Sequence, residues 1–471
     1  AAIAVWFGMT SSASAILAAA LFAVLVLDPW AVLAPGFWLS FGAVAVILYV
    51  TAGRLMRPHW LHNWATVQWA VTVALVPPLL ALFQQVSLVS PVANAIAIPL
   101  VGLVVVPLTL AGVAAPFDLP LHAAHFVMQS CMGLLEWLSA LPDAVWQQHA
   151  PPRWAIVAAI AGIAWMLLPR GFPARGLGAV LCLPLFLSAP AQLAEGEAKL
   201  TMLDVGHGLA VVVQTRHHAL LYDTGPAFGP GADSGTRIIV PYLRASGIRR
   251  LDAMVVSHDD IDHSGGAASV LSAMPVAWVL TSLPDVDPLL FESEQAWRCH
   301  SGQSWVWDGV RFEIMGPTLA SYEDATLKDN DRSCVLKIAT PSGHVLLPAD
   351  IERRAEGALL DDPGRDLYAD VLVAPHQGSR TSSSAEFVER VQPQIVIFPV
   401  GYRNRFGHPH TDVVERYRAT GAKIYRTDRD GAITLMLASE GRMRIEPFRA
   451  VYRRYWQTPF AGELPADPEA L

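Results

Sequence analysis

The chain has 471 residues, 53% of them hydrophobic, and a formal net charge of −8 at pH 7. This length allows two or three domains, and the acidic excess argues against a protein that grips nucleic acid through a generally basic surface. The charges are unevenly spread: residues up to about 190 include five Lys/Arg and four Asp/Glu, whereas those from Glu195 onward include 28 and 37. A sparsely charged region followed by a well-charged one predicts a membrane domain followed by a soluble domain.

Seven apolar segments can be marked in the first region. They lie at about 10–27, 37–53, 65–83, 91–115, 122–141, 154–169 and 176–191. Several are shorter than the roughly 20 residues of a standard span, so any one of them could be re-entrant or interfacial. A buried globular core is the alternative, but so many apolar runs with so few charges make it a poor account. Because the chain opens with Ala inside apolar sequence, we expect a fragment or the C-terminal part of a longer protein.

Basic residues predict the orientation of these segments. Arg54 and Arg57 lie between the second and third, and Arg170 and Arg175 lie between the sixth and seventh. An even number of crossings separates the two loops, so both can lie in the cytoplasm, as the positive-inside rule requires. The seventh segment then crosses outward and places the soluble region outside. That segment also resembles a signal peptide, because its apolar run ends in the small residues of 188–191, and this alternative gives the same placement.

The four cysteines say little about the fold. Cys131 and Cys182 lie in apolar runs, where a free thiol behaves as a small hydrophobe. Cys299 and Cys334 lie in the charged region and could pair if that region faces an oxidising compartment, but we do not expect a disulfide between them.

The soluble region contains short β-branched and apolar runs that end in acidic turns. Strands are predicted at Leu200–Leu203, Ala219–Tyr222 and Leu251–Val256, and the first two end at Asp204 and Asp223. Strands of this kind alternating with helices predict a layered α/β domain. The two aspartates are either structural turn formers or side chains that orient metal ligands from behind.

The third of these strands leads into a loop rich in histidine and aspartate. His258, Asp260, Asp262 and His263 follow one another within six residues. Imidazoles and carboxylates delivered together by one strand end are typical of a metal site. Their spacing resembles the HxHxDH signature of the metallo-β-lactamase fold, with Asp260 in place of the second histidine. The alternative is a polar turn that caps a helix, with Asp259 or Asp260 as the N-cap.

Other strand ends repeat this arrangement. Asp350, His376 and His408 each follow a predicted strand, and Asn330 and Ser333 lie just before another. A single histidine is more often an ordinary surface or core residue. Several ligand-type residues at strand ends predict one active edge of a sheet sandwich.

These motifs together resemble the ComEC family, the membrane channel proteins of natural DNA uptake. The stretches that carry the resemblance in the soluble region are Leu203–Gly206, Asp223–Gly225, His258–Gly266, Asp350, His376–Ser383, Gly407–His410 and Thr427–Gly431. Pro35–Phe41 and Ser90–Asn94 resemble the membrane part of the family. The family's N-terminal region, an extracellular OB-like domain and early helices, is expected to lie outside this sequence. His376-Gln377 stands where the family commonly has two adjacent histidines.

The resemblance implies a polytopic α-helical membrane domain followed by an αββα metallo-β-lactamase-like domain. The expected boundaries are 1–192 for the membrane domain, 193–198 for a linker, 199–450 for the metallo-β-lactamase-like domain and 451–471 for a C-terminal tail. It also implies passage of single-stranded DNA through the membrane domain and metal-dependent cleavage of a phosphodiester by the soluble domain on the periplasmic or extracellular side.

The resemblance also assigns roles to the motif residues. Six side chains are predicted to hold two divalent ions: His258 and Asp260 on the first, Asp262, His263 and His376 on the second, and Asp350 between them. Asp262 and His408 are the predicted catalytic residues, with His408 as a proton donor or phosphate contact; the alternative for His408 is an ordinary loop residue held by the following proline. The first ion lacks a third histidine, and Asn330 or Ser333 stands near that gap. A site so rich in oxygen suits Mn²⁺ as well as Zn²⁺.

DNA, lipid and other proteins are the expected partners. Arg332, Arg380, Arg403 and Arg405 lie in the motif loops and are candidates for phosphate contacts. Membrane lipid, other DNA-uptake proteins and a second copy of the chain are further expected partners. Two other hypotheses stay open: a soluble domain that gates or guides DNA without catalysis, and a transporter or hydrolase for another substrate.

Overall fold

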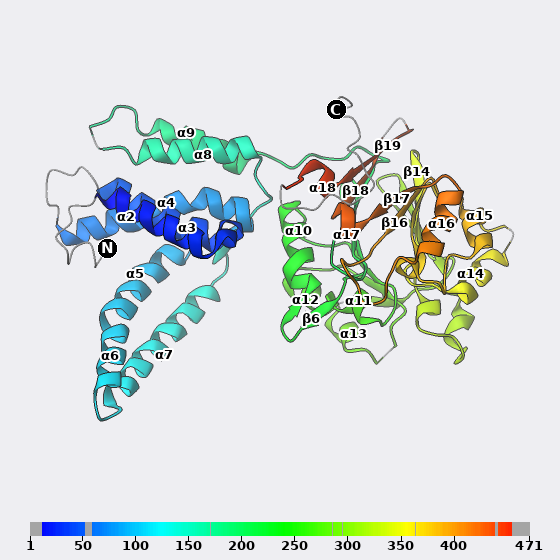
Figure 1. The fold of residues 1–471 in the computed structure, drawn as a ribbon, viewed down its shortest axis with the longest axis horizontal. Coiled ribbons are helices and arrows are strands. Elements are labelled where there is room, and N and C mark those ends of the chain that lie inside the picture. The colour runs from blue at the N-terminus through cyan, green and yellow to red at the C-terminus, as the bar shows by residue number, and fades with distance from the viewer. Residues whose placement is uncertain are drawn as a thin grey trace. The chain divides into compact units, whose positions relative to one another are not determined.

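The structure is a computed structural model that describes residues 12–51, 59–169, 171–284, 286–293, 295–362, 364–438 and 441–454. The chain divides into two compact units, and the boundary between them falls at Pro190–Ala191 (Figure 1). Of the basic residues used to predict the orientation, Arg54, Arg57 and Arg170 lie outside the described residues, as does most of the expected C-terminal tail.

The first unit is helical, and each predicted apolar segment contains a helix. The helices are α2 (Ala13–Leu27), α3 (Pro35–Thr51), α4 (Trp60–Phe83), α5 (Ser90–Leu100), α6 (Val106–Ala114), α7 (Leu119–Ser139), α8 (Arg153–Met166) and α9 (Leu177–Leu187). Two helical stretches are long and apolar enough to cross a membrane, Leu61–Phe83 and Ser90–Ala114. The first unit therefore has the apolar helices expected of a membrane domain.

The second of these stretches is continuous but irregular. A π-helical turn, Val101–Val105, joins α5 to α6, and Pro107 stands in the first turn of α6. Proline lacks the amide hydrogen and crowds the carbonyl of the preceding turn, so an α-helix containing it distorts there. Short β-strands, β1 (Gln85–Ser87) and β2 (Val145–Gln147), also pair within this unit.

Helices α8 and α9 pack closely through glycine, and Figure 1 shows them side by side. A Cβ atom on Gly162 would collide with the carbonyl oxygen of Gly178, and a Cβ atom on Gly178 would collide with that of Gly162. Small residues that let two backbones approach are typical of helix pairs in membranes.

The second unit contains two large β-sheets. The first has the strand order β10-β9-β8-β5-β4-β3-β18-β19 and the second β11-β12-β13-β14-β15-β16-β17. The strands of the first sheet are β3 (Ala198–Met202), β4 (Val211–Gln214), β5 (Ala219–Tyr222), β8 (Ala253–Val256), β9 (Val279–Thr281), β10 (Ala296–Arg298), β18 (Ile433–Ala438) and β19 (Arg442–Pro447). Those of the second are β11 (Ser304–Trp307), β12 (Val310–Gly316), β13 (Val335–Thr340), β14 (Gly343–Leu347), β15 (Val371–Val373), β16 (Ile395–Phe398) and β17 (Lys423–Arg426). A short pair, β6 (Ala227–Gly229) and β7 (Ala232–Asp233), lies apart from both sheets.

Three apolar cores hold the layers together. Residues such as Val213, Phe312 and Leu347 fill the space between the sheets. A second core lies between the first sheet and its helices, and a third lies between the second sheet and its helices. Figure 1 shows the two sets of helices on opposite sides of the strands. The helices are α10 (Val240–Ala245), α11 (Ile261–Ser264), α12 (Ala267–Ala273), α13 (Pro288–Glu292), α14 (Arg353–Leu360), α15 (Ala385–Val391), α16 (Thr411–Ala419), α17 (Thr427–Asp430) and α18 (Phe448–Val451). This is the αββα arrangement that the family resemblance implied.

A disulfide joins the two sheets. Cys299 directly follows β10 of the first sheet, Cys334 directly precedes β13 of the second, and their Cα atoms are 6.0 Å apart. Both are fully buried in the core between the sheets. The expectation that these cysteines stay unpaired was therefore wrong. Their approach depends on how two sheets pack, which the spacing of 35 residues does not reveal.

Parallel pairing gathers several strand ends at one edge. Strands β5, β8, β9 and β10 pair in parallel, and so do β14, β15, β16 and β17. The carboxyl ends of parallel neighbours lie at the same edge of a sheet, and ligands bind there in open α/β sheets. The side chains predicted to bind metal follow β8, β14 and β15, so the topology brings them to this edge.

Candidate metal centre

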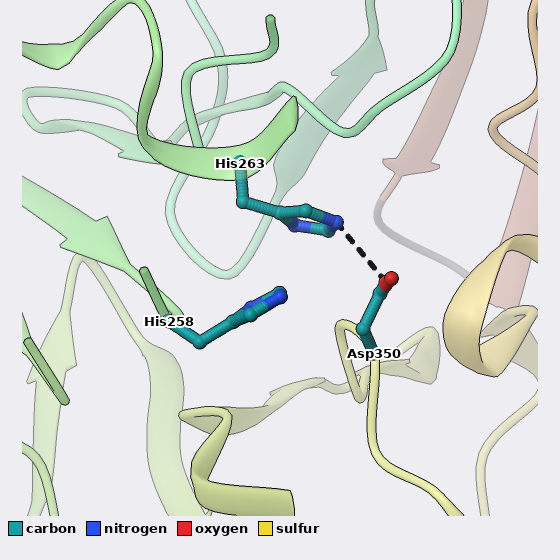
Figure 2. Close-up of side chains that lie close together, drawn as sticks. All are labelled: His258, His263 and Asp350. Atoms are coloured by element: carbon teal, nitrogen blue, oxygen red, sulfur yellow. Dashed lines mark ion pairs between the residues drawn. The ribbon is translucent and has the colours of Figure 1, made fainter. Parts of the chain in front are cut away.

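Three buried side chains form the centre of the site (Figure 2). His258 follows β8, His263 lies in α11, and Asp350 follows β14. Their possible ligand atoms all lie within 4.8 Å of one another. Nε2 of His263 is 3.1 Å from Oδ1 of Asp350, the pair joined by the dashed line in Figure 2. Two imidazoles and a carboxylate converging in this way are suited to a divalent cation.

The other predicted ligands surround these three. Asp260 Oδ2 is 3.4 Å from Nε2 of His258, and Asp262 Oδ2 is 3.8 Å from Nε2 of His263. His376 Nε2 is 3.7 Å from Oδ2 of Asp350. The structure therefore brings all six predicted ligands into one connected group. Asp260 does stand at the N-cap of α11, but its side chain makes no capping hydrogen bond and faces His258 instead.

Asp223 organises both histidines of the centre from behind. This fully buried carboxylate accepts hydrogen bonds from the amide of Ser257 at 2.7 Å and from its hydroxyl at 2.8 Å. It also lies 2.7 Å from Nδ1 of His263, while the Ser257 hydroxyl lies 2.9 Å from Nδ1 of His258. Partners at Nδ1 fix the rings and leave Nε2 for a metal, an arrangement common behind metal-binding histidines. The structure thus places Asp223 where a ligand-orienting residue is expected.

The other three residues expected behind the ligands are placed differently. The hydroxyl of Ser333 is 3.3 Å from Nδ1 of His258, so it touches the centre. Asn330 begins a short 3₁₀ turn, and no contact between its side chain and the six ligands is found among the residues described. Asp204 pairs with Arg449 at 3.0 Å. Burial raises the pKa of Asp204, and Arg449 opposes that rise.

The charges of the centre favour a cation. His263 is fully buried, which lowers the pKa of an imidazole, but Asp350 and Asp223 at its two nitrogens outweigh burial and raise that pKa well above its usual value. Burial of Asp350 acts to raise its pKa, yet the histidines around it, His263 above all, hold it below its ordinary range. Nε2 of His258 is buried and has no hydrogen-bond partner among the residues described. An orphaned imidazole nitrogen aimed at a cluster of carboxylates fits a bound divalent ion.

The backbone is unusual where it delivers these side chains. Asp223, Ala349, His376 and Gln377 all have positive φ angles, between 46° and 57°. For residues other than glycine such angles are unfavourable, and they cluster at functional sites where the surroundings hold them in place. Gln377 is nearly fully buried, and its amide nitrogen donates to Oδ2 of Asp262 at 2.7 Å. No role was predicted for Gln377, although it stands where the family commonly has a second histidine.

A group of rings lies beside the centre. His408 has ring contacts with His207, Phe406, His410 and His376, the last at a centroid separation of 5.9 Å. Burial and the neighbouring histidines lower the pKa of His408 to about 4, so its ring is neutral at pH 7 and can donate only a neutral N–H. His207, for which no role was predicted, is stacked on Phe406. The signal that could have found it is its place in the glycine turn after β3, at the same edge as Asp223.

The four candidate DNA-binding arginines have different surroundings. Arg332 donates to the carbonyl groups of Ser321 and Asp324 and pairs with Asp329, so its guanidinium is engaged inside the protein. Arg380 is exposed and pairs with Asp412 at 3.1 Å. The remaining two, Arg403 and Arg405, each lie over an aromatic ring.

Each unit matches a known protein-family model. A family model described as Competence protein matches residues 1–173, and one described as Metallo-beta-lactamase superfamily matches residues 203–401. The chain is 38% identical over 439 residues to "Competence protein ComA" of Neisseria gonorrhoeae, covering 93% of this chain and 60% of that protein. It is 32% identical to "Uncharacterized protein YcaI" of Escherichia coli K12, covering 94% and 58%. It is 25% identical to "ComE operon protein 3" of Bacillus subtilis 168, covering 87% and 56%.

The chain thus spans less than two thirds of the length of these curated relatives. The soluble unit has the metallo-β-lactamase-like fold, and membership of that superfamily implies binding of divalent metal. The apolar helices of the first unit suit a membrane domain. Both domains in this order, together with these relatives, are consistent with a ComEC-family protein, as the motifs predicted.

Proposed function

We propose that the soluble unit is a metal-dependent phosphodiesterase that cuts single-stranded DNA, and that the membrane unit forms part of the path by which DNA enters the cell. The observation that carries the first part is the buried cluster of His258, His263 and Asp350. The second part is supported by the match to the Competence protein model and by a relative named as a competence protein. A candidate hydrolytic site and apolar helices in one chain would suit a protein that processes one strand while the other passes.

The residues present would hold up to two divalent ions. His258 and Asp260 would serve one, His263, Asp262 and His376 the other, with Asp350 shared. Such ions supply Lewis-acid chemistry and charge neutralisation to a phosphodiester. The protein's own contribution is positional: Asp223 fixes two imidazoles, and Gln377 holds Asp262. A mixed set of nitrogen and oxygen ligands suits Mn²⁺ and Zn²⁺ alike.

The test is a metal and nuclease assay of the full 471-residue chain in detergent. We expect up to two ions per chain and cleavage of single-stranded DNA when Mn²⁺ or Zn²⁺ is supplied separately. Asp350→Asn should lose bound metal and cleavage together, because its carboxylate lies between both ligand groups. Glu446→Gln, on the edge strand β19 and paired with Arg444, is the matched control and should change neither.

Two outcomes would decide against this proposal. A wild-type chain that binds no divalent ion contradicts the catalytic role and favours a domain that gates or guides DNA. If the chain binds metal but leaves DNA intact, the proposed metal site is supported and DNA is excluded as the substrate. In that case the hydrolysis of another phosphodiester is the hypothesis to test next.

We also propose that the soluble unit lies on the periplasmic or extracellular side. The Cys299–Cys334 disulfide supports this, because disulfides persist in oxidising compartments and are rare in the cytosol. The distribution of arginines between apolar segments supports the same placement. Membrane lipid, other DNA-uptake proteins and a second copy of the chain are the partners proposed with it.

Transformation assays separate transport from cleavage. In a naturally transformable host whose own relative is deleted, a protein carrying this chain should restore DNA uptake. Deletion of Ser90–Ala114 should abolish uptake, because one of the two longest apolar helical stretches is lost. His258→Ala should lose strand cleavage yet retain some uptake. Normal transformation after the deletion would indicate that the membrane unit transports something else.

A further inference from the structure

The loop that joins β16 to α16 is a braced structure beside the metal centre. Residues Gly401–His410, called the rim loop below, follow the carboxyl end of β16. The side-chain amide of Asn404 donates to the carbonyl groups of Gly401 and His408 and accepts from the amide of His408. One side chain therefore ties the start of the loop to its end.

Close packing fixes the rim loop against the neighbouring turn. A Cβ atom on Gly401 would lie 2.6 Å from the amide nitrogen of His207, so only glycine fits at that position. The ring of Phe406 is stacked on the ring of His207, with centroids 5.0 Å apart and planes 24° apart. His408 continues from this stack to His376, a predicted metal ligand. The position of Phe406 relative to the centre is thus set by contacts on both sides.

The same loop presents aromatic and cationic groups to solvent. Tyr402 is 64% exposed and Phe406 is 49% exposed, which is unusual for large rings at a braced position. The guanidinium of Arg403 lies 5.2 Å from the centre of the Tyr402 ring, and that of Arg405 lies 4.7 Å from the centre of the Phe406 ring. Neither arginine has an ion-pair partner among the residues that the structure describes. In a unit with an overall acidic excess, two exposed and unpaired cations over aromatic rings of one loop are available to an anionic ligand.

These features match the way proteins hold unpaired nucleobases. Bases of single strands stack on aromatic rings and on guanidinium planes, and the same guanidinium groups neutralise phosphates. We propose that the guanidinium groups of Arg403 and Arg405, backed by the rings of Tyr402 and Phe406, form a stacking platform for two bases of single-stranded DNA. The strand held there would place its backbone next to His376 and the metal centre.

The platform specifies the substrate class of the proposed phosphodiesterase, and in that respect it rests on the proposed function. In a duplex the base faces are covered by their neighbours, so stacking on protein rings favours single strands. It also explains how an acidic unit can bind a polyanion, because part of the affinity comes from base faces, which carry no charge.

Binding without catalysis tests the platform directly. Fluorescence anisotropy would measure how tightly the full chain, in detergent with EDTA, binds three labelled ligands. These are a single-stranded oligonucleotide, an abasic strand of equal length and a duplex. Phe406→Ala and Tyr402→Ala should each weaken binding of the normal strand by about five- to 150-fold, the range for loss of one stacked base. Neither should change binding of the abasic strand, which has phosphates and no bases.

Control variants keep the experiment specific. Phe406→Tyr retains a ring and should bind as the wild type does. Trp297→Ala removes a half-exposed ring from the edge strand β10 and should leave all three affinities unchanged. Wild-type metal content in every variant would show that the centre remains folded.

The outcomes separate this inference from the proposed function. If Phe406→Ala and Tyr402→Ala bind the normal strand as the wild type does, or lose affinity equally for the abasic strand, the platform is contradicted whether or not the chain is a nuclease. If the wild type discriminates normal from abasic strands through these rings but cuts neither with Mn²⁺ or Zn²⁺, the platform stands and the hydrolytic function is lost.

Discussion

Asp223 is the residue on which the orientation of both central imidazoles depends. Asp223→Asn leaves one acceptor oxygen in place of two, so its NH2 group must face either the amide of Ser257 or the pair formed by the Ser257 hydroxyl and Nδ1 of His263. We expect metal affinity to fall about 10- to 100-fold, the usual effect of losing such a supporting group. Metal titration of the purified chain, followed by calorimetry, measures this.

Asp204→Asn is the matched control for that prediction. Both aspartates follow strands of the first sheet at the same edge, but Asp204 pairs with Arg449 and not with a ligand histidine. We expect the metal affinity of Asp204→Asn to equal that of the wild type. Equal losses in the two variants would mean that Asp223 acts through general stability and not through the imidazoles.

For single residues, the sequence predicts the candidate metal ligands well, but it predicts hydrogen-bond and ion-pair partners poorly. His258, His263, Asp350 and His376 could be selected because each follows a short apolar strand. The bond between Asp204 and Arg449 spans 245 residues, and the hydrogen bond between Gln377 and Asp262 spans 115. Such pairs depend on the packing of distant elements, so no local pattern indicates them. Arg332 was expected to face DNA, and its guanidinium instead bonds to carbonyl groups of the preceding loop, whose conformation the residue pattern does not reveal.

Among the elements, two hairpin turns are tied together by one carboxylate. Asp308, in the turn between β11 and β12, accepts from the hydroxyl of Thr215 at 2.6 Å and from the amide of His217 at 2.8 Å. Its oxygens also contact the imidazoles of His217 and His218 in the turn between β4 and β5. Asp308→Asn keeps a residue that tolerates the positive φ here, and should lower the free energy of unfolding by about 1–3 kcal/mol.

The contribution of Asp308 should depend on pH in the acid range. Burial acts to raise the pKa of Asp308, but hydrogen bonds from Thr215 and His217 outweigh it and hold the pKa below its ordinary value. Because the folded-state pKa is depressed, the stabilisation is present above the unfolded value of about 4 and is lost as pH falls below it. Thermal unfolding by circular dichroism should therefore show wild type and Asp308→Asn converging below about pH 4. A constant difference down to pH 2 would contradict this assignment.

The glycine contact between α8 and α9 gives a prediction for the membrane unit. Gly162→Ala would force the two helices apart, because the added methyl group meets the backbone of Gly178. We expect a lower midpoint of thermal unfolding in detergent. Gly133→Ala, in α7 with open space around it, is the control and should be neutral or slightly stabilising, since alanine is the better helix former. Equal effects of the two changes would mean that the contact does not hold the pair together.

Element types were easier to predict than element packing. The alternation of strands and acidic turns predicted the layered soluble unit, and each apolar segment proved to contain a helix. Two features escaped prediction because they follow from the sandwich itself. One is the disulfide between sheets, and the other is the rim loop, whose ring stack with His207 joins segments about 200 residues apart in sequence.

For the whole molecule, the decisive prediction concerns the side of the membrane. In a background with Cys131 and Cys182 changed to serine, single cysteines would be placed at Val286, which is 81% exposed, and at Leu55, between Arg54 and Arg57. The outer envelope of the cells would be permeabilised while the inner membrane stays sealed. A membrane-impermeant thiol reagent should then label Val286→Cys and not Leu55→Cys. The reverse pattern would place the soluble unit in the cytoplasm and remove incoming DNA as its substrate.

The Cys299–Cys334 disulfide also affects when the support of the metal centre can form. Cys334 adjoins Ser333, whose hydroxyl contacts His258, and the carbonyl of Cys334 accepts from the buried Tyr222 of the opposite sheet. A newly made chain in a reducing cytosol lacks the bond between the sheets, because thiols there are kept reduced. If the soluble unit lies outside the cytosol, as proposed, the support behind His258 is completed only there, in the compartment where the proposed substrate arrives. Maturation of the proposed enzyme would then be confined to that side of the membrane, and DNA inside the cell would be spared.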